Sequence, residues 1–259
     1  MTLQRSSGAA AFSAGAAAYA ATMAPALRPV AGEVVRRAAL RPAESVLDIG
    51  TGTGTAARLA IGDGRHVVGL DAARGMLEIA RQEVPGVEFV EADFTKLPMA
   101  DGSIDVVIAA HALLFADDRV ATLREWLRVV APGGRISLSV PGPGDVMPAT
   151  VLHRVYDQYG ITWGDNDYPT MAELAGWATQ AGWSDVETAA DPTIGIQLAD
   201  DDLFRAWLSV GPRGRATGEW SPQRHDEFAR DLMVATPRSP DGGYRLPFGA
   251  LYLTARRPR

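Results

Sequence analysis

The chain has 259 residues, a length that suits one α/β domain with additions and allows a sizeable buried core. Acidic residues outnumber basic ones by 31 to 25, and the net charge of −6 argues against a polyanion such as nucleic acid as the main partner. Cysteine is absent and there are only four histidines, so disulfides, thiolate metal sites and cysteine nucleophiles are excluded and no metal centre is expected.

The first segment, residues 6–27, carries no charge and is mostly Ala, Gly and Ser. It lacks the Leu- and Val-rich run of a signal peptide or a membrane span, so the sequence predicts a cytoplasmic protein without a membrane span. Apolar residues recur there at helical spacing and predict an Ala-rich helix over about residues 9–24. Pro25 and Pro29 are expected to break this helix before a second one over residues 30–40.

Two interpretations remain for residues 1–40. The apolar stripe of the first helix packs against the core, or the region forms a helical lid over a bound ligand. In the second case we expect Tyr19 to lie near the ligand and Arg28 to pair with a ligand carboxylate.

Residues 46–54 read VLDIGTGTG, a short apolar strand followed by three closely spaced glycines. The glycines predict a tight turn that leads into a helix over residues 55–60. Glycine is favoured where the backbone takes a positive φ and approaches a ligand more closely than a Cβ would allow. The stretch therefore predicts a ligand-binding turn at the end of the first strand, although a glycine turn without a ligand is also possible.

Two nucleoside ligands compete for this turn. A dinucleotide fingerprint has the spacing G-x-G-x-x-G, but Thr55 stands where its last glycine belongs. Asp48, near the ligand end of the strand, would repel a pyrophosphate, whereas S-adenosylmethionine (SAM) carries an ammonium and a sulfonium. The sequence favours SAM, with a nicotinamide-dependent oxidoreductase as the rival.

Two further strands end in acidic residues. Residues 66–71 predict a second strand ending in Asp71, which either accepts hydrogen bonds from both ribose hydroxyls or caps the next helix. Residues 87–91 predict a third strand, after which Asp93 is placed to accept from an adenine amino group with Phe94 against the ring.

Residues 104–110 predict a fourth strand that is nearly all apolar. Apolar strands alternating with helices indicate a parallel sheet covered on both faces, whose ligands bind at the carboxyl ends of the strands. Gly50, Asp71, Asp93 and His111 all fall at such ends, which favours one shared site. Met76 in the helix after Asp71 either covers an adenine face or packs in the core.

The rest of the chain continues the alternation. Pro132, Gly133 and Gly134 predict a turn before the fifth strand. The further elements expected are helices over 72–83, 117–130, 147–159, 171–181, 201–210 and 222–234, and strands over 135–140, 184–189 and 250–256, the last at an edge of the sheet. We expect a single domain, 1–259, made of a lid (1–40), a ligand-binding core (44–140) and two substrate-cover insertions (141–168 and 195–245).

Five stretches together resemble the class I SAM-dependent methyltransferases, in particular the branch of the ubiquinone and menaquinone biosynthesis methyltransferases. They are VLDIGTGTG (46–54), VVGLD (67–71), EADFTKLP (91–98), DGSIDVVIAAHALLF (101–115) and LREWLRVVAPGGRISLS (123–139). The resemblance implies an α/β, Rossmann-like, mostly parallel seven-stranded sheet of order 3-2-1-4-5-7-6, with strand seven antiparallel, helices on both faces and an added helical cover. It also assigns the glycine turn to the methionyl part of SAM.

The resemblance assigns Asp71 to the ribose, Asp93 to adenine and the backbone near Ala109 to the cofactor's amino group. With the residues named above, the expected cofactor-binding set is Tyr19, Arg28, Asp48, Gly50, Thr51, Gly52, Gly54, Asp71, Ala72, Met76, Ala92, Asp93, Phe94, Ala109 and Ala110.

Methyl transfer from a sulfonium is an in-line displacement, so alignment and water exclusion can supply much of the catalysis. A phenol, hydroxyl or activated carbon acceptor also benefits from a base, for which His111 is the first candidate and His153 the second. In the alternative, His111 packs against the cofactor and His153 is structural or solvated. Aromatic residues in the cover segments either pack the added helices, which is expected of most of them individually, or line a pocket. A lining of this kind favours a small aromatic or lipophilic acceptor, with O- or C-methylation. The aromatic residues are Tyr156, Tyr159, Trp163, Tyr168, Phe204, Trp207 and Trp220.

Two other function classes remain as alternatives. A nucleic-acid methyltransferase would more usually show a basic face and, for amino-group methylation of DNA, an Asn/Asp-Pro-Pro-aromatic run where residues 109–112 read AAHA. A non-catalytic SAM-fold module that only binds a ligand fits the same motifs, because methyl transfer requires no invariant catalytic residue.

Overall fold

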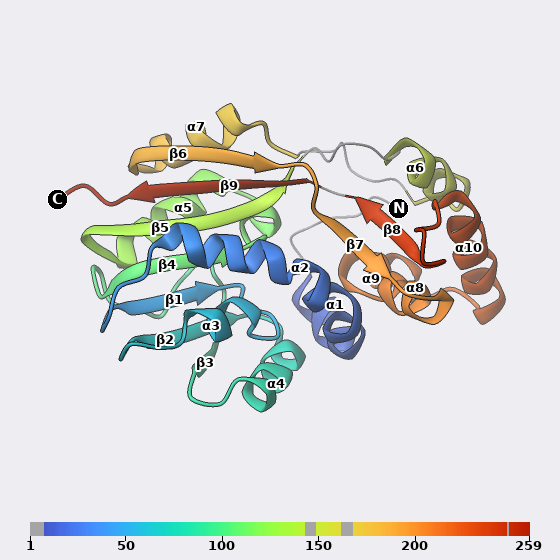
Figure 1. Cartoon of the computed structure of the whole chain (residues 1–259), viewed down its shortest axis with the longest axis horizontal. Helices are drawn as coiled ribbons and strands as arrows, with labels where there is room; N and C mark the ends of the chain where they lie inside the picture. The colour runs from blue at the N-terminus through green and yellow to red at the C-terminus, as the bar shows by residue number, and fades with distance from the viewer. Residues whose placement is uncertain (1–7, 143–148, 162–167, 248) are drawn as a thin grey trace.

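The computed structural model describes residues 8–142, 149–161, 168–247 and 249–259. Its main sheet has seven strands in the order β3-β2-β1-β4-β5-β9-β6, with β9 antiparallel to both of its neighbours (Figure 1). The strands are β1 (Ser45–Ile49), β2 (His66–Asp71), β3 (Glu88–Glu91), β4 (Ile104–Ala110), β5 (Val130–Gly142), β6 (Ser184–Asp191) and β9 (Gly249–Arg256). β9 is the seventh strand of this sheet in chain order, because β7 and β8 form a separate pair. The α/β fold class and the strand order 3-2-1-4-5-7-6 are therefore confirmed.

Helices cover both faces of the sheet because successive side chains of each strand point to opposite faces. Val46 packs with α2 (Ala16–Ala38), α3 (Thr55–Ala60) and α4 (Arg74–Glu83) on one face. The next residue, Leu47, packs on the other face in the core that includes Leu123, Trp126 and Leu174 of α5 (Arg119–Val129) and α7 (Met171–Ala181). Both side chains are fully buried, which explains why the strands read as continuous apolar runs.

A second, smaller unit lies beyond the carboxyl ends of the parallel strands, next to α1 (Ala9–Ala14) (Figure 1). We call it the cap. It consists of α6 (Ala149–Gln158), α8 (Asp201–Leu208), α9 (Gly211–Thr217), α10 (Pro222–Ala235) and the antiparallel pair β7 (Gly195–Leu198) and β8 (Tyr244–Pro247). Its buried residues form their own core, separate from the two cores of the sheet. Sequence patterning predicted the longer helices of the cap but neither α9 nor the strand pair.

The expectation that Pro25 and Pro29 break the N-terminal helix is wrong. α2 runs through both prolines, and the interruption falls instead at Gly15, between α1 and α2. Both prolines lie on the exposed face of α2, whereas Leu27 and Val30 are buried. Proline disfavours a helix interior locally, but packing of the opposite face along the whole helix outweighs that preference.

Two expectations for the sheet are also wrong. β9 is not an edge strand, because it pairs with β5 on one side and β6 on the other. The Pro132–Gly134 run is not a turn before the fifth strand but lies within β5, next to an irregularity in the register with β4. Tertiary pairing decides both points, since a strand's neighbours are not visible in its own sequence.

A buried ion pair fastens the end of α2 to the sheet. Arg135 on β5 donates to both carboxylate oxygens of Glu44, each at 2.8 Å, and the two side chains are only 11% and 13% exposed. Arg135 also donates to the backbone carbonyls of Ala38 and Ala39 at the end of α2, where the helix offers these carbonyls no further N–H.

Among the described residues no helix is long and apolar enough to cross a membrane.

We expect Arg135→Met to lower the free energy of unfolding by about 3 kcal/mol, because it leaves the Glu44 carboxylate buried without its partner. Urea denaturation measures the change. Arg58→Met is the matched control: the Arg58–Glu83 pair, at 3.3 Å, is 51% and 61% exposed, and its loss should cost less than about 1 kcal/mol. Equal losses in the two variants would contradict the assigned role of Arg135.

Candidate functional site

The glycine turn after β1 has the backbone conformation that the sequence predicts. Gly50, Gly52 and Gly54 have φ values of 68°, 55° and 84°, which only glycine adopts readily. The N–H groups of Gly50 and Thr51 both donate to the carbonyl of Leu70 at the end of β2, at 2.8 and 3.0 Å. The turn is therefore held against the neighbouring strand.

The buried side chain of Asp48 holds this turn by hydrogen bonds. Its side chain is 1% exposed, and Oδ2 accepts hydrogen bonds from the Thr51 hydroxyl at 2.6 Å and the Ala57 N–H at 2.9 Å. Oδ1 has no hydrogen-bond partner among the residues that the structure describes. Burial raises the pKa of Asp48 to about 7, against the effect of the two hydrogen bonds.

Asp71 ends β2 beside the turn. Its Oδ2 accepts from the Gly52 N–H at 2.9 Å and its Oδ1 from the Ala73 N–H at 2.8 Å, while burial raises its pKa. The first contact joins the acidic end of β2 to the glycine turn, and the second closes a short turn before α4. Asp71 does not cap this helix, because Ala73 is its N-cap and no side chain caps it, and each Asp71 carboxylate oxygen retains a lone pair for a further donor.

The segment after β3 is more exposed to solvent than the ends of β1 and β2. Asp93 is exposed, and its Oδ1 accepts from both the N–H and the hydroxyl of Thr95. Ala92, just before it, donates its N–H to the carbonyl of Asp71 at 3.0 Å, which holds this segment beside β2. Phe94 packs edge-on against Trp126, at 6.2 Å between ring centroids, so its ring contributes to the core. A contact of Phe94 with adenine stays a prediction.

Helices α1 and α2 form the segment that the sequence predicts as a lid, and we keep that name for it; α2 places Tyr19 over the glycine turn. A Cβ added to Gly52 would lie 3.8 Å from the Tyr19 ring, the nearest atom it would meet. The Tyr19 side chain is partly buried, and its phenol lies close enough to Asp71 and Asp48 that desolvation and these carboxyls raise its pKa. Met76 is 2% exposed and packs with Ala16 and other residues beneath the lid, a core role.

Arg28 does not join this group. It lies nine residues after Tyr19 in α2, about 180° around a helix of 3.6 residues per turn, and it is exposed. The structure therefore places it on the opposite face of α2 from the glycine turn. The expected pairing of Arg28 with a ligand carboxylate has no support in this arrangement.

Aromatic residues continue the lid toward the end of β4. Phe12 packs edge-on against Tyr19 and, at 5.3 Å between centroids, against Phe115. The Ser13 hydroxyl accepts the Gly75 N–H at 2.7 Å and docks α1 on the start of α4. These contacts close the lid over the ends of β1, β2 and β4.

His111 follows Ala109 and Ala110 at the end of β4, with a φ of 62° that is uncommon for a residue with a side chain. Its N–H donates to the Ser139 carbonyl at 3.0 Å, and its Nδ1 lies 3.1 Å from the Ser139 hydroxyl. The side chain is 8% exposed, and burial lowers its pKa to about 4. The imidazole is therefore neutral at physiological pH, and it is a weak proton acceptor.

The second base candidate, His153, falls on α6, but its side chain lies outside the described residues, as does Trp163. Most of the remaining cover aromatics pack on one another. Tyr159 stacks on Trp220, Tyr156 packs against Phe228, and Phe204 packs against Trp207 and Tyr244. They build the core of the cap more than they line a pocket.

A SAM molecule fits the residues at this end of the sheet. The Asp48 carboxylate oxygen without a partner and the carboxyl of Asp71 are suited to a cationic ligand that carries hydroxyls. The position that a Gly52 side chain would fill is open as far as Tyr19. In the described part of the chain, no group of acidic and histidine side chains is placed to hold a metal ion.

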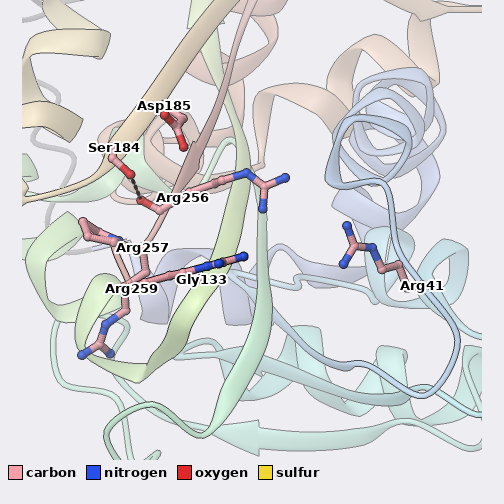
Figure 2. A pocket seen from close by; sticks show the side chains of 8 residues that line it. Arg41, Gly133, Ser184, Asp185, Arg256, Arg257 and Arg259 are labelled. Atoms are coloured by element: carbon pink, nitrogen blue, oxygen red, sulfur yellow. Dashed lines mark hydrogen bonds between the residues drawn. The ribbon is translucent and has the colours of Figure 1, made fainter.

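A hollow of about 510 Å³ lies at the other end of the strands from the glycine turn, where β5 and β6 begin and β9 ends (Figure 2). It is lined by Arg41, Gly133, Ser184, Asp185, Arg256, Arg257, Pro258 and Arg259. Arg257 donates to the carbonyls of Leu127 and Arg128 and so has a structural role at the end of α5. The hollow is remote from the glycine turn and is not part of the candidate site.

Comparison with known proteins gives an independent result. Residues 47–138 match the family described as "Methyltransferase domain". A demethylmenaquinone methyltransferase of Clavibacter sepedonicus is 39% identical over 218 residues, which cover 74% of this chain and 82% of that protein.

Solved structures show the same fold at lower identity. A phosphoethanolamine N-methyltransferase of Haemonchus contortus in complex with SAM aligns with a TM-score of 0.53 and 18% identity, over 85% of this chain and 50% of that one. The [4+2]-cyclase SpnF aligns with a TM-score of 0.56 and 21% identity, over 89% and 80% of the two chains.

We expect Gly50→Ala to destabilise the protein more than Gly64→Ala. Both glycines have a φ of 68°, so both variants carry the same backbone strain of about 1–2 kcal/mol. Only at Gly50 would the new Cβ meet another atom, the Ala112 Cβ at 2.5 Å, whereas Gly64 has open space. Thermal and urea unfolding should show an additional loss of about 1–3 kcal/mol for Gly50→Ala. Equal losses would mean that the turn tolerates displacement.

Because the pKa of Asp48 is raised, we expect the free energy of unfolding to depend on pH through this residue. The folded state holds the proton more tightly than the unfolded chain, so the contribution of Asp48 to stability is present below about pH 4 and is lost as pH rises to about 7. The difference in unfolding free energy between the wild type and Asp48→Asn should therefore fall across that range. Urea denaturation at several pH values measures it, and a difference independent of pH would contradict a buried Asp48 with a raised pKa.

Proposed function

Because this chain belongs to the class I SAM-dependent methyltransferases and uses SAM as its cofactor, we propose that it methylates an oxygen or a carbon atom of a small aromatic or lipophilic molecule. One observation carries the proposal: Gly52, Asp71, Asp48 and Tyr19 meet at the carboxyl ends of β1 and β2, beside a cap with its own core. The similarity to a demethylmenaquinone methyltransferase supports a ring-shaped acceptor.

We assign the cofactor contacts residue by residue as part of this proposal. When bound, SAM supplies an electrophilic methyl group on a sulfonium. Asp71 accepts hydrogen bonds from the ribose hydroxyls with its remaining lone pairs, and Asp93 accepts from the adenine amino group through Oδ2, since Thr95 occupies Oδ1. Asp48 stabilises the ligand's positive charge, and Tyr19 covers the site from the lid.

The backbone supplies the remaining contacts in this proposal. Gly50, Thr51, Gly52 and Gly54 present a turn close enough for the methionyl part. Ala109 and Ala110 present carbonyls at the end of β4. Ala72 and Ala92 lie beside the two acidic strand ends.

His111 is assigned to the acceptor side. With a pKa of about 4 the ring is neutral, so it orients an acceptor hydroxyl by a hydrogen bond more readily than it stores a proton. Most of the rate enhancement then comes from alignment of the acceptor and exclusion of water by the lid and the cap. His153 remains the second candidate for a base.

A ligand-binding series tests the proposal. SAM and S-adenosylhomocysteine should each raise the melting temperature, because a ligand that binds only the folded state stabilises it by mass action. NAD and NADP should leave the melting temperature unchanged, since the carboxyl of Asp48 repels a pyrophosphate. Incubation with methyl-labelled SAM and a panel of phenols, naphthols and quinols should then transfer label to one of them.

Each outcome separates the alternatives. A thermal shift with NAD alone would favour a nicotinamide-dependent oxidoreductase. A shift with SAM but no transfer to any ring acceptor would favour a ligand-binding module on the same fold.

A further inference from the structure

Arg213 on α9 differs from Arg135, another arginine that the protein covers. Arg135 is held by Glu44, whereas no carboxylate among the described residues pairs with Arg213. Arginine side chains are seldom covered by protein unless they are paired. Arg213 is nevertheless only partly exposed, and burial lowers its pKa.

The surroundings of Arg213 are aromatic and hold its guanidinium in place. Its Cζ lies 4.2 Å from the ring centroid of Trp207, and its Nε–H donates to the Trp207 carbonyl at 3.3 Å. The phenols of Tyr156 and Tyr168 lie close enough to affect its pKa electrostatically. Stacking on Trp207 and the Nε hydrogen bond orient the side chain. A guanidinium carries four further N–H donors on its two terminal nitrogens.

Arg213 lies where the cap meets the lid and the sheet. Tyr156 belongs to α6 of the cap, and Tyr168 precedes α7, which covers the sheet. The neighbouring Gly214 packs against Ser209, and the carbonyl of Ser209 lies 3.0 Å from where a Cβ on Gly15 of the lid would be. Arg213 therefore lies at the junction of the three parts that enclose the acceptor in the proposed function.

We propose that Arg213 binds a planar oxyanion, a carboxylate or its equivalent, on the methyl acceptor, so that the substrate is an aromatic acid. The inference rests on the proposed function and narrows its substrate class. A guanidinium presents paired N–H donors that match a carboxylate, and its charge in a partly desolvated site favours an anion over its neutral analogue. The surrounding rings suit the flat remainder of such a molecule.

The test compares acids with their amides, which have nearly the same shape and lack the charge. Calorimetry with saturating S-adenosylhomocysteine measures binding of 1-hydroxy-2-naphthoate and salicylate, and of 1-hydroxy-2-naphthamide and salicylamide. We expect at least one acid to bind ten-fold or more tightly than its amide. Arg213→Gln should abolish this preference, and Arg213→Lys should retain part of it, because the charge remains and the paired donors do not.

Arg224→Gln is the matched control. Arg224 also stacks on a tryptophan of the cap, with its Cζ 4.3 Å from the Trp220 ring centroid, and donates to a backbone carbonyl, but it is exposed. Its substitution should leave the acid-to-amide ratio unchanged. A purely structural role for Arg213 would weaken acids and amides alike, so the ratio separates recognition from misfolding. If Arg213→Gln does not fold, Arg213→Lys carries the comparison.

Equal binding of acid and amide by the wild type, or an undiminished preference in both Arg213 variants, would overturn the inference. Amides that bind as tightly as the acids and accept a labelled methyl group would uphold the proposed function while overturning the inference. If no member of either series binds and no ring acceptor is methylated, the proposed function fails and the inference fails with it.

Discussion

The hydrogen bonds that Asp48 accepts are the contacts on which the rest of the site depends. One carboxylate oxygen joins Thr51 in the glycine turn to Ala57 in α3, so the end of β1, the turn and the following helix keep one geometry. That geometry allows the Gly52 N–H to reach Asp71 on β2. Burying a carboxyl there costs stability, which the raised pKa of Asp48 reflects, and strain or desolvation of this kind is common where a fold prepares a binding site.

The sheet with its helices and the cap are packed as two units, each with cores of its own. The sheet and its helices hold the strand ends that we assign to the cofactor, and their cores do not include the cap residues. The cap uses its aromatic residues to pack its own core, so few of them remain to contact an acceptor. We therefore propose that acceptor recognition involves side chains at the junction, among them Arg213, whose guanidinium stacks on Trp207. A [4+2]-cyclase has the same fold, so the fold alone does not define the reaction.

Local patterns predicted those parts of the fold in which local chemistry decides the structure. The glycines at 50, 52 and 54 need positive φ values, and each acidic strand end lies where a parallel sheet collects its ligands. Helix interiors with proline and strands with unknown neighbours were predicted less well. Pro25 and Pro29 lie within α2 because its other face is buried, and β9 is central because β5 and β6 both pair with it. The edge-on packing of Phe94 on Trp126 depends on residues 32 positions apart.

The sequence by itself determined the family and the cofactor, because these follow from short motifs whose residues are close in the chain and whose spacing carries the chemistry. The strand order was implied by the resemblance to that family. Only the tertiary structure decided that Tyr19 covers the turn while Arg28 faces away, that His111 is buried and neutral, and that Arg213 has no carboxylate partner among the described residues. These properties depend on burial and on partners distant in the chain, and a pKa or an unmet charge arises only when such segments come together.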